Sequence, residues 1–75
     1  MRPDELAELL ERQPFRPLRL HLTGEREFEI RHPEMAMVGR SVVHIFAPAE
    51  RGVIVSSRSE VVVTLIHIVV IEFLD

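Results

Sequence analysis

The C-terminal run from Val61 to Leu74 constrains the fold more than any other feature of this chain. Eleven of its fourteen residues are apolar, and the run contains neither Gly nor Pro. A strand with one wet face alternates apolar and polar residues, whereas Val61–Val63 and Ile68–Ile71 place apolar side chains on both faces. A second layer must therefore cover this run. The cover is the chain's own helix, the far wall of a small barrel, or another copy of the chain.

Length and composition favour a single domain, residues 1–75, that associates with itself. A chain of 75 residues is near the size at which one core only just offsets chain entropy. Cys is absent, so disulfides and thiolate metal sites are excluded. Because 47% of the residues are apolar, we expect more apolar surface than one small interior can hide, and hence a homo-oligomer.

Charge and targeting signals point to a soluble cytoplasmic protein. The formal net charge is −3, whereas dedicated nucleic-acid binders usually carry the opposite balance, and the nine Arg form no cluster in the sequence. The start Met1–Leu6 is acidic where a signal peptide is basic. The C-terminal run is shorter than the ~20 apolar residues that span a bilayer, so we expect no membrane insertion.

An N-terminal helix is predicted over residues 3–13. Pro3 suits the first helical position, and acidic residues follow it in the first turn. Pro14 ends the pattern. The apolar residues of this segment recur at helical spacing and give the helix one apolar stripe, made of Leu6, Leu9 and Leu10.

From Arg16 onward the apolar period changes to two, which is typical of strands. A hairpin follows, with strands around residues 18–22 and 26–31. Only an odd loop length keeps both apolar faces together, and a loop over residues 23–25 satisfies this condition. The predicted cross-strand partners are Leu18 with Ile30, Arg19 with Glu29, Leu20 with Phe28, and His21 with Glu27.

The remaining pattern completes a mainly β fold with an N-terminal α-helix. Residues 33–39 resemble a short helical turn, 41–47 a third strand, 48–52 a turn, and 53–55 further extended chain. The fourth and fifth strands lie within 61–74, with a corner near residues 66–67. In the last strand we expect Val69, Ile71 and Phe73 to face inward and Val70, Glu72 and Leu74 to face outward. The strands of residues 16–74 form either a five-stranded, strongly bent antiparallel sheet or a small barrel.

No pattern in the sequence indicates catalysis, a metal or a cofactor. The four His are not spaced as metal ligands, and the Asp residues are near the termini. The Ser residues lack a nucleophile motif, and the three Gly are isolated at turns rather than gathered in a phosphate loop. We therefore expect a protein that is not an enzyme and has no catalytic residue, metal site or cofactor.

Two groups of residues are candidates for interaction surfaces. The densest polar group is a possible recognition surface, although ordinary capping of the turn, with Glu34 at the positive end of its dipole, is the favoured explanation. Its residues are Arg31, His32, Glu34 and Arg40. The candidates for self-association belong to the C-terminal run and are Val61, Val63, Val70 and Leu74.

Three stretches of the chain resemble a family of very short uncharacterised bacterial proteins. They read PFRPLRLHLT from Pro14, FEIRHPE from Phe28 and LIHIVVIE from Leu65. Members often read Thr-Asp-Gly-Arg at the hairpin, where this chain has Thr23-Gly24-Glu25-Arg26. The family has no established activity, so the resemblance implies no functional residue.

The order of one helix, then five short strands with a corner between the last two, is also similar to the Sm-like small barrel. Sm-like proteins bind RNA in rings joined edge to edge through their last strands, but this chain lacks their RNA-contact motifs. The leading hypothesis is a non-enzymatic protein-interaction module that self-associates through its C-terminal strands. An unidentified protein is a possible further partner. The alternative is an Sm-like RNA-binding protein.

Overall fold

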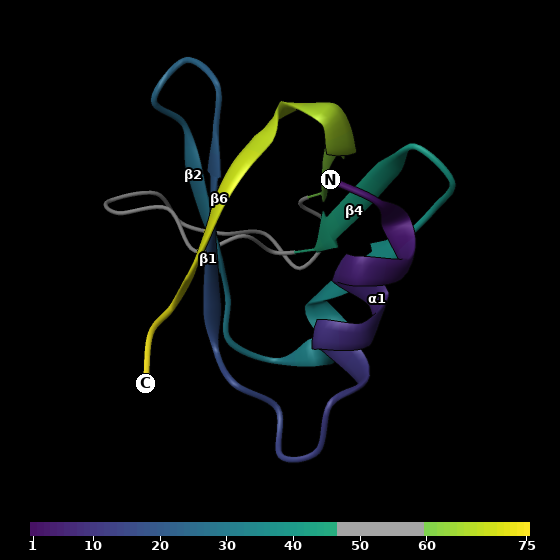
Figure 1. Cartoon of the computed structure of the whole chain (residues 1–75), viewed down its shortest axis with the longest axis vertical. Coiled ribbons are helices and arrows are strands. Elements are labelled where there is room, and N and C mark those ends of the chain that lie inside the picture. Colours follow the sequence, from purple (N-terminus) through teal and green to yellow (C-terminus); the bar gives the residue numbers. More distant parts are fainter. Residues whose placement is uncertain (47–59) are drawn as a thin grey trace.

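The computed structural model describes residues 1–46 and 60–75 (Figure 1). The predictions for residues 48–52 and 53–55 lie outside this described part. In chain order the elements are α1 (Pro3–Glu11), β1 (Leu18–Leu22), β2 (Glu27–Ile30), the 3-10 turn η1 (Pro33–Met35), β3 (Ala36–Val38), β4 (Val42–Phe46), β5 (Glu60–Thr64), the 3-10 turn η2 (Leu65–His67) and β6 (Ile68–Phe73).

The strands form two antiparallel three-stranded sheets, which we call sheet A (order β2-β1-β6) and sheet B (order β3-β4-β5). The predicted mainly β class with one N-terminal helix is therefore confirmed. No ladder joins the two sheets in the described part, so these strands do not close a barrel. The helical turn predicted for 33–39 ends at Met35, and residues 36–38 pair with β4 as an additional strand.

The predicted hairpin register is confirmed at all four positions, from Leu18 opposite Ile30 to His21 opposite Glu27. The backbone N–H of Leu22 donates to the carbonyl of Arg26 at 2.8 Å and closes the three-residue loop. Two loop residues, Gly24 (φ 81°) and Glu25 (φ 63°), have left-handed backbone conformations. This conformation suits Gly but strains Glu25, since a side chain there crowds its own backbone.

The two sheets and the helix share one apolar core. Each sheet turns one face inward, because side chains alternate along its strands. From the helix, Leu6 is fully buried in this core, while Leu9 and Leu10 pack against it. The other core residues are Leu18, Leu20, Phe28, Ile30, Val43, Ile45, Val63, Leu65 and Ile68.

Helix α1 ends at Glu11, two residues before the predicted end at residue 13. Arg12 is already extended (φ −64°, ψ 139°). Pro14 explains the early end, because proline disfavours a helical conformation in the residue before it and clashes with the carbonyl four residues earlier.

The C-terminal run is two strands joined by η2, which confirms the predicted corner at residues 66–67. The prediction that Val69 faces inward is wrong. His21 pairs with Val70, but the next residue, Leu22, pairs with Ile68, so Val69 is an extra residue on β6. Such a β-bulge reverses the alternation of side chains. Ile68 therefore takes the inward place, and Val69 is exposed.

Candidate functional site

Strands β5 and β6 each have one open edge in the described structure. β5 pairs with β4 alone, and β6 pairs with β1 alone. The N–H of Leu74 donates to the carbonyl of Pro17 at 2.9 Å. Successive residues of an antiparallel strand direct their backbone N–H and C=O groups alternately to its two sides, so Glu72 and Val70, like Leu74, direct theirs to β1. Ile71 and Phe73 consequently direct theirs to the open side, where a further strand could pair.

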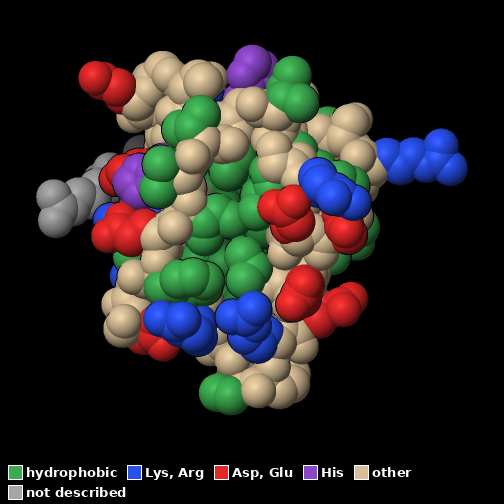
Figure 2. Space-filling view, viewed as in Figure 1, with side chains coloured by type: hydrophobic (Ala, Val, Ile, Leu, Met, Phe, Trp, Pro, Cys, Tyr) green, Lys and Arg blue, Asp and Glu red, His purple; other side chains and the backbone are tan. Residues whose placement is uncertain are grey.

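An open groove lies beside this edge of β6. It is lined by Ile68, Val69, Val70 and Ile71 on one side and by Met1 and Glu5 on the other. Figure 2 shows apolar side chains gathered in the region between β6 and α1. The amino group of Met1 donates to the carbonyl of Leu65 at 3.2 Å, which ties the start of the chain to the corner before β6. The groove thus places apolar contacts next to unpaired backbone groups.

Most of the large exposed apolar side chains of the described residues belong to the same C-terminal elements. They are Val62 (54% exposed) on β5, Ile66 (75%) on η2, and Val69 (59%) and Val70 (53%) on β6. Met37 on β3 (61%) is the exception. Exposed apolar side chains that cluster beside an open strand edge are typical of an interaction surface.

The four predicted self-association residues have different positions. Val70 is exposed, and Leu74 is half-buried at the end of sheet A. Val63 (4% exposed) lies in the core, and Val61 packs against it, because both lie opposite the buried residues of β4. Val63 is therefore buried within one chain, and Val61 is only partly exposed.

Sequence reasoning missed three residues of the surface: Val62, Ile66 and Val69. The strict alternation of β5 could have identified Val62, since its neighbours on both sides face inward. The exposure of Val69 depends on the bulge opposite His21 and Leu22, and a continuous apolar run carries no signal for a bulge.

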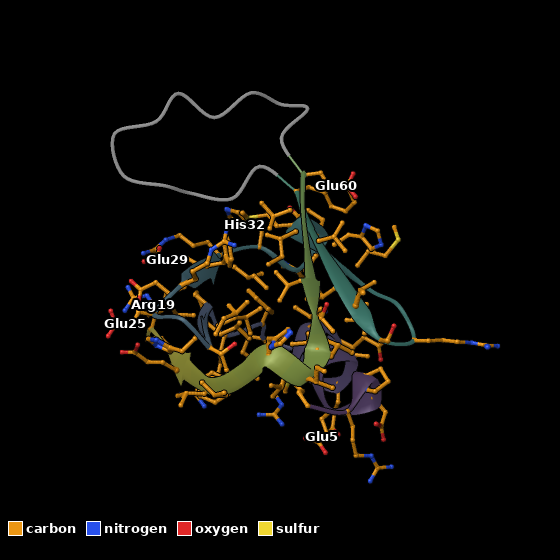
Figure 3. All side chains as sticks on the ribbon, turned by 90° about the horizontal axis from the view of Figure 1, so that it is seen from above. Glu5, Arg19, Glu25, Glu29, His32 and Glu60 are labelled. Carbon is orange, nitrogen blue, oxygen red and sulfur yellow. The ribbon has the colours of Figure 1, made fainter. Side chains whose placement is uncertain are left out.

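The outer face of sheet A carries a network of charged side chains that joins its three strands. Arg19 on the central strand contacts Glu29 on β2 at 2.6 Å and Glu72 on β6 at 3.2 Å. His21 also reaches Glu72, with 2.9 Å between Nε2 and Oε1. Figure 3 shows Arg19 and Glu29 side by side. The network holds β6 against β1 from the outer side.

The network shifts the pKa of three of its members. The hydrogen bond from Arg19 lowers the pKa of Glu29, and the hydrogen bond with His21 lowers the pKa of Glu72. The hydrogen bond to Glu29 raises the pKa of Arg19. These ionised forms stabilise one another, so each carboxylate of the network lies near a cation of the same chain, while Arg19 Nε has no hydrogen-bond partner among the described residues.

The residues of the predicted polar recognition surface are all exposed but do not form a joined group. Arg31 turns back to Glu29, with 3.1 Å from Nε to Oε2. No ion pair joins any two of Arg31, His32, Glu34 and Arg40 in the described part of the chain. Glu34 lies in the first turn of η1, and the N-cap residue His32 makes no side-chain capping hydrogen bond.

The described residues show no other chemical centre. Within residues 1–46 and 60–75, no three His, Asp or Glu side chains are placed to hold a metal ion. No helix in that part is long and apolar enough to cross a membrane. His67 contacts the Thr23 hydroxyl through Nδ1 at 3.2 Å, while its carbonyl accepts from the Thr23 N–H at 3.0 Å.

Comparisons of the chain with protein-family models, with curated proteins and with solved structures found no match.

Proposed function

We propose that this protein is a non-enzymatic, cytoplasmic interaction module that associates with itself through β5 and β6. The observation that carries the proposal is the open edge of β6, where unpaired backbone groups lie beside an apolar groove. A strand edge of this kind adds a strand from another chain by main-chain hydrogen bonds, and apolar contacts supply the remaining affinity.

The strand that we propose for this edge is β5 of a second copy. The N–H of Leu65 donates to the carbonyl of Ser41 at 2.8 Å, so residues 61 and 63 face β4. Val62 and Thr64 then direct their backbone groups outward. The two open edges are similar in length, at five residues for β5 and six for β6. The carboxylate of Glu72 does not repel a second chain at this edge, because Arg19 and His21 already pair with it.

The Sm-like small barrel is the finer fold that we propose. In sheet A the first strand lies between β2 and the last strand, and the chain passes to sheet B at η1 and returns at η2. If β2 and β3 are one strand bent at η1, the order becomes that of five strands with a corner before the last. This order and the resemblance to very short bacterial proteins support the proposal by analogy alone.

The test is the mass of the protein in solution as a function of concentration, measured by light scattering and sedimentation velocity. We expect an oligomer for the wild type. We expect Val70→Arg to lower the mass, because the substitution places a charge in the groove beside the β6 edge. Met37→Arg is the matched control, since Met37 is equally exposed but lies on β3.

Two results would overturn the proposal. One is a monomeric wild type at every concentration. The other is an equal loss of mass in Val70→Arg and Met37→Arg, which would assign the association to general surface hydrophobicity. Circular dichroism of both variants establishes that each is folded, so that a lower mass reports on the surface.

A further inference from the structure

A second groove lies at the loop end of the β1–β2 hairpin, where the hairpin faces β5 and η2. Its lining includes Thr23, Arg26 and Phe28 from the hairpin, Val62 from β5, and His67 from η2. Val69 and Val70, which line the β6 groove, are not part of it. The groove combines polar side chains with apolar ones, so it offers both kinds of contact that small-molecule sites use.

Arg26 is the cation of this groove. Its guanidinium carbon lies 5.3 Å from the centre of the Phe28 ring. Phe28 belongs to the core, and residues two apart share a face of a strand, so Arg26 lies on the inner side, at the mouth of the space between the sheets. Glu27 points to the other face, where it contacts Arg19 and His21.

Arg26 makes no ion pair with any carboxylate of the described residues. Most other arginines in that part do, namely Arg2, Arg12, Arg16, Arg19 and Arg31. Among residues 1–46 and 60–75, no acidic residue lines the groove, whereas Glu5 lines the groove beside β6 and Glu11 lines a third groove beside α1. In a chain with a net charge of −3, this groove is therefore a locally positive site.

His67 and Thr23 supply polar groups opposite the arginine. The Thr23 hydroxyl and His67 Nδ1 are 3.2 Å apart, and the backbone bond between the same residues fixes the hairpin against η2. When the hydroxyl donates to Nδ1, the imidazole proton is on Nε2, and this N–H can donate to a ligand. The site then combines a guanidinium with a neutral donor.

We propose that this groove binds a small organic anion, with its oxyanion group at Arg26 and an apolar body against Val62. Guanidinium binds carboxylate and phosphate oxygens by the same paired hydrogen bonds, so the shared chemistry is an oxyanion on an apolar body. The exposed Val62 side chain provides the apolar contact. The groove lies along β5, whose open edge we also propose for self-association, so a bound anion and a second copy of the chain would compete for this edge.

The test is an NMR titration of the intact protein with three probes: phenyl phosphate, benzoate and inorganic phosphate. We expect saturable shifts of the Thr23, Thr64 and His67 amides with phenyl phosphate, with benzoate, or with both. Binding of one organic probe alone identifies the source of the oxyanion as phosphate or carboxylate. Inorganic phosphate lacks the apolar body, and we expect it to bind more weakly than the organic probes.

Arg26→Gln should weaken binding of the organic probe about tenfold, because a charge-assisted hydrogen bond is lost. Arg40→Gln is the matched control: Arg40 is exposed, makes no described ion pair and is not part of the groove. Equal weakening by both substitutions would overturn the proposal, as would the absence of saturation with every probe. The amide spectrum of each variant shows directly that it is folded.

Discussion

Sheets A and B have similar inner faces and different outer faces. Both inner faces are apolar and fully buried at their centres, at Leu20 in sheet A and Ile45 in sheet B. The outer face of sheet A is covered by ionised groups around Arg19. The outer face of sheet B has the cross-strand row Met37, His44 and Val62, in which both end residues are apolar and exposed.

This difference shows which outer face pairs its charges within one chain and which leaves apolar side chains exposed. In sheet A each carboxylate of the outer face has a cation on a neighbouring strand, so the face needs no partner. In sheet B the polar side-chain contact on the outer face of the described residues is the hydrogen bond between His44 Nδ1 and Glu60 Oε1, at 2.6 Å. Exposed apolar groups continue from sheet B through Ile66 to Val69. An interaction surface is therefore expected on the side of β5, η2 and β6.

The largest expected change in the free energy of unfolding comes from substitutions in the two inner faces, which should have similar effects. Leu20→Ala and Ile45→Ala each remove most of a fully buried side chain and leave a cavity. Each should lower the free energy of unfolding by about 2–5 kcal/mol. Urea denaturation at one fixed protein concentration measures the change, because association also contributes to apparent stability.

Met37→Ala is the control for these core substitutions, since Met37 is exposed on the outer face of sheet B but lies on β3, away from the proposed interface. We expect a change within about 0.5 kcal/mol. A loss as large as that of Ile45→Ala would show that the outer face of sheet B is itself buried, and the contrast between the two faces would then be wrong.

The contrast between the sheets also shows what the sequence could predict. Hairpin β1–β2 was predicted to single-residue register, because Leu18, Leu20 and Leu22 alternate with polar residues and the loop length must be odd. The corner near His67 was also predicted. The break into two sheets and strand β3 were not predicted, because the segment 36–38 has only three residues and follows a helical turn.

The candidate surface was predicted only in part. Exposure of Val70 followed from alternation, but Val63 was assigned to the surface although it is buried. In a run where successive residues are all apolar, the face of each residue depends on register with its neighbour strand. For β5 that neighbour is β4, and for β6 it is β1 with its bulge. These long-range pairings are not visible in the run itself.

The second prediction concerns pH and the network of sheet A. The pKa of Glu29 and that of Glu72 are lowered in the folded chain, so their stabilisation is present above the unfolded value, about 4.3, and is lost as pH falls through the folded values. Wild-type stability should therefore fall on acidification below about pH 4.3. Arg19→Met removes the central cation, so its stability should be lower near neutral pH and should depend less on pH in this window.

Urea midpoints measured across that acidic range check the result. Arg12→Met is the matched control, because Arg12 makes an exposed ion pair with Glu8 on α1, at 3.9 Å. Its pH profile should remain parallel to that of the wild type. An unchanged acid dependence in Arg19→Met would mean that the outer face of sheet A does not derive its stability from this network.

The smallest expected effect concerns the hairpin loops. In the described residues, left-handed backbone occurs at Gly24 and Glu25, both in the β1–β2 loop of sheet A, and not between β3 and β4 of sheet B. Glu25→Gly should raise the free energy of unfolding by about 1 kcal/mol, since it relieves the strain of a side chain at φ 63°.

Arg40→Gly is the matched change in the connection of sheet B. Arg40 has no left-handed backbone to relieve, so added freedom of the unfolded chain should lower its stability by about 0.4–1 kcal/mol. Thermal unfolding of the two variants should therefore give shifts of opposite sign. Shifts of the same sign would show that the two loops are equally relaxed, and the strain assigned to Glu25 would be wrong.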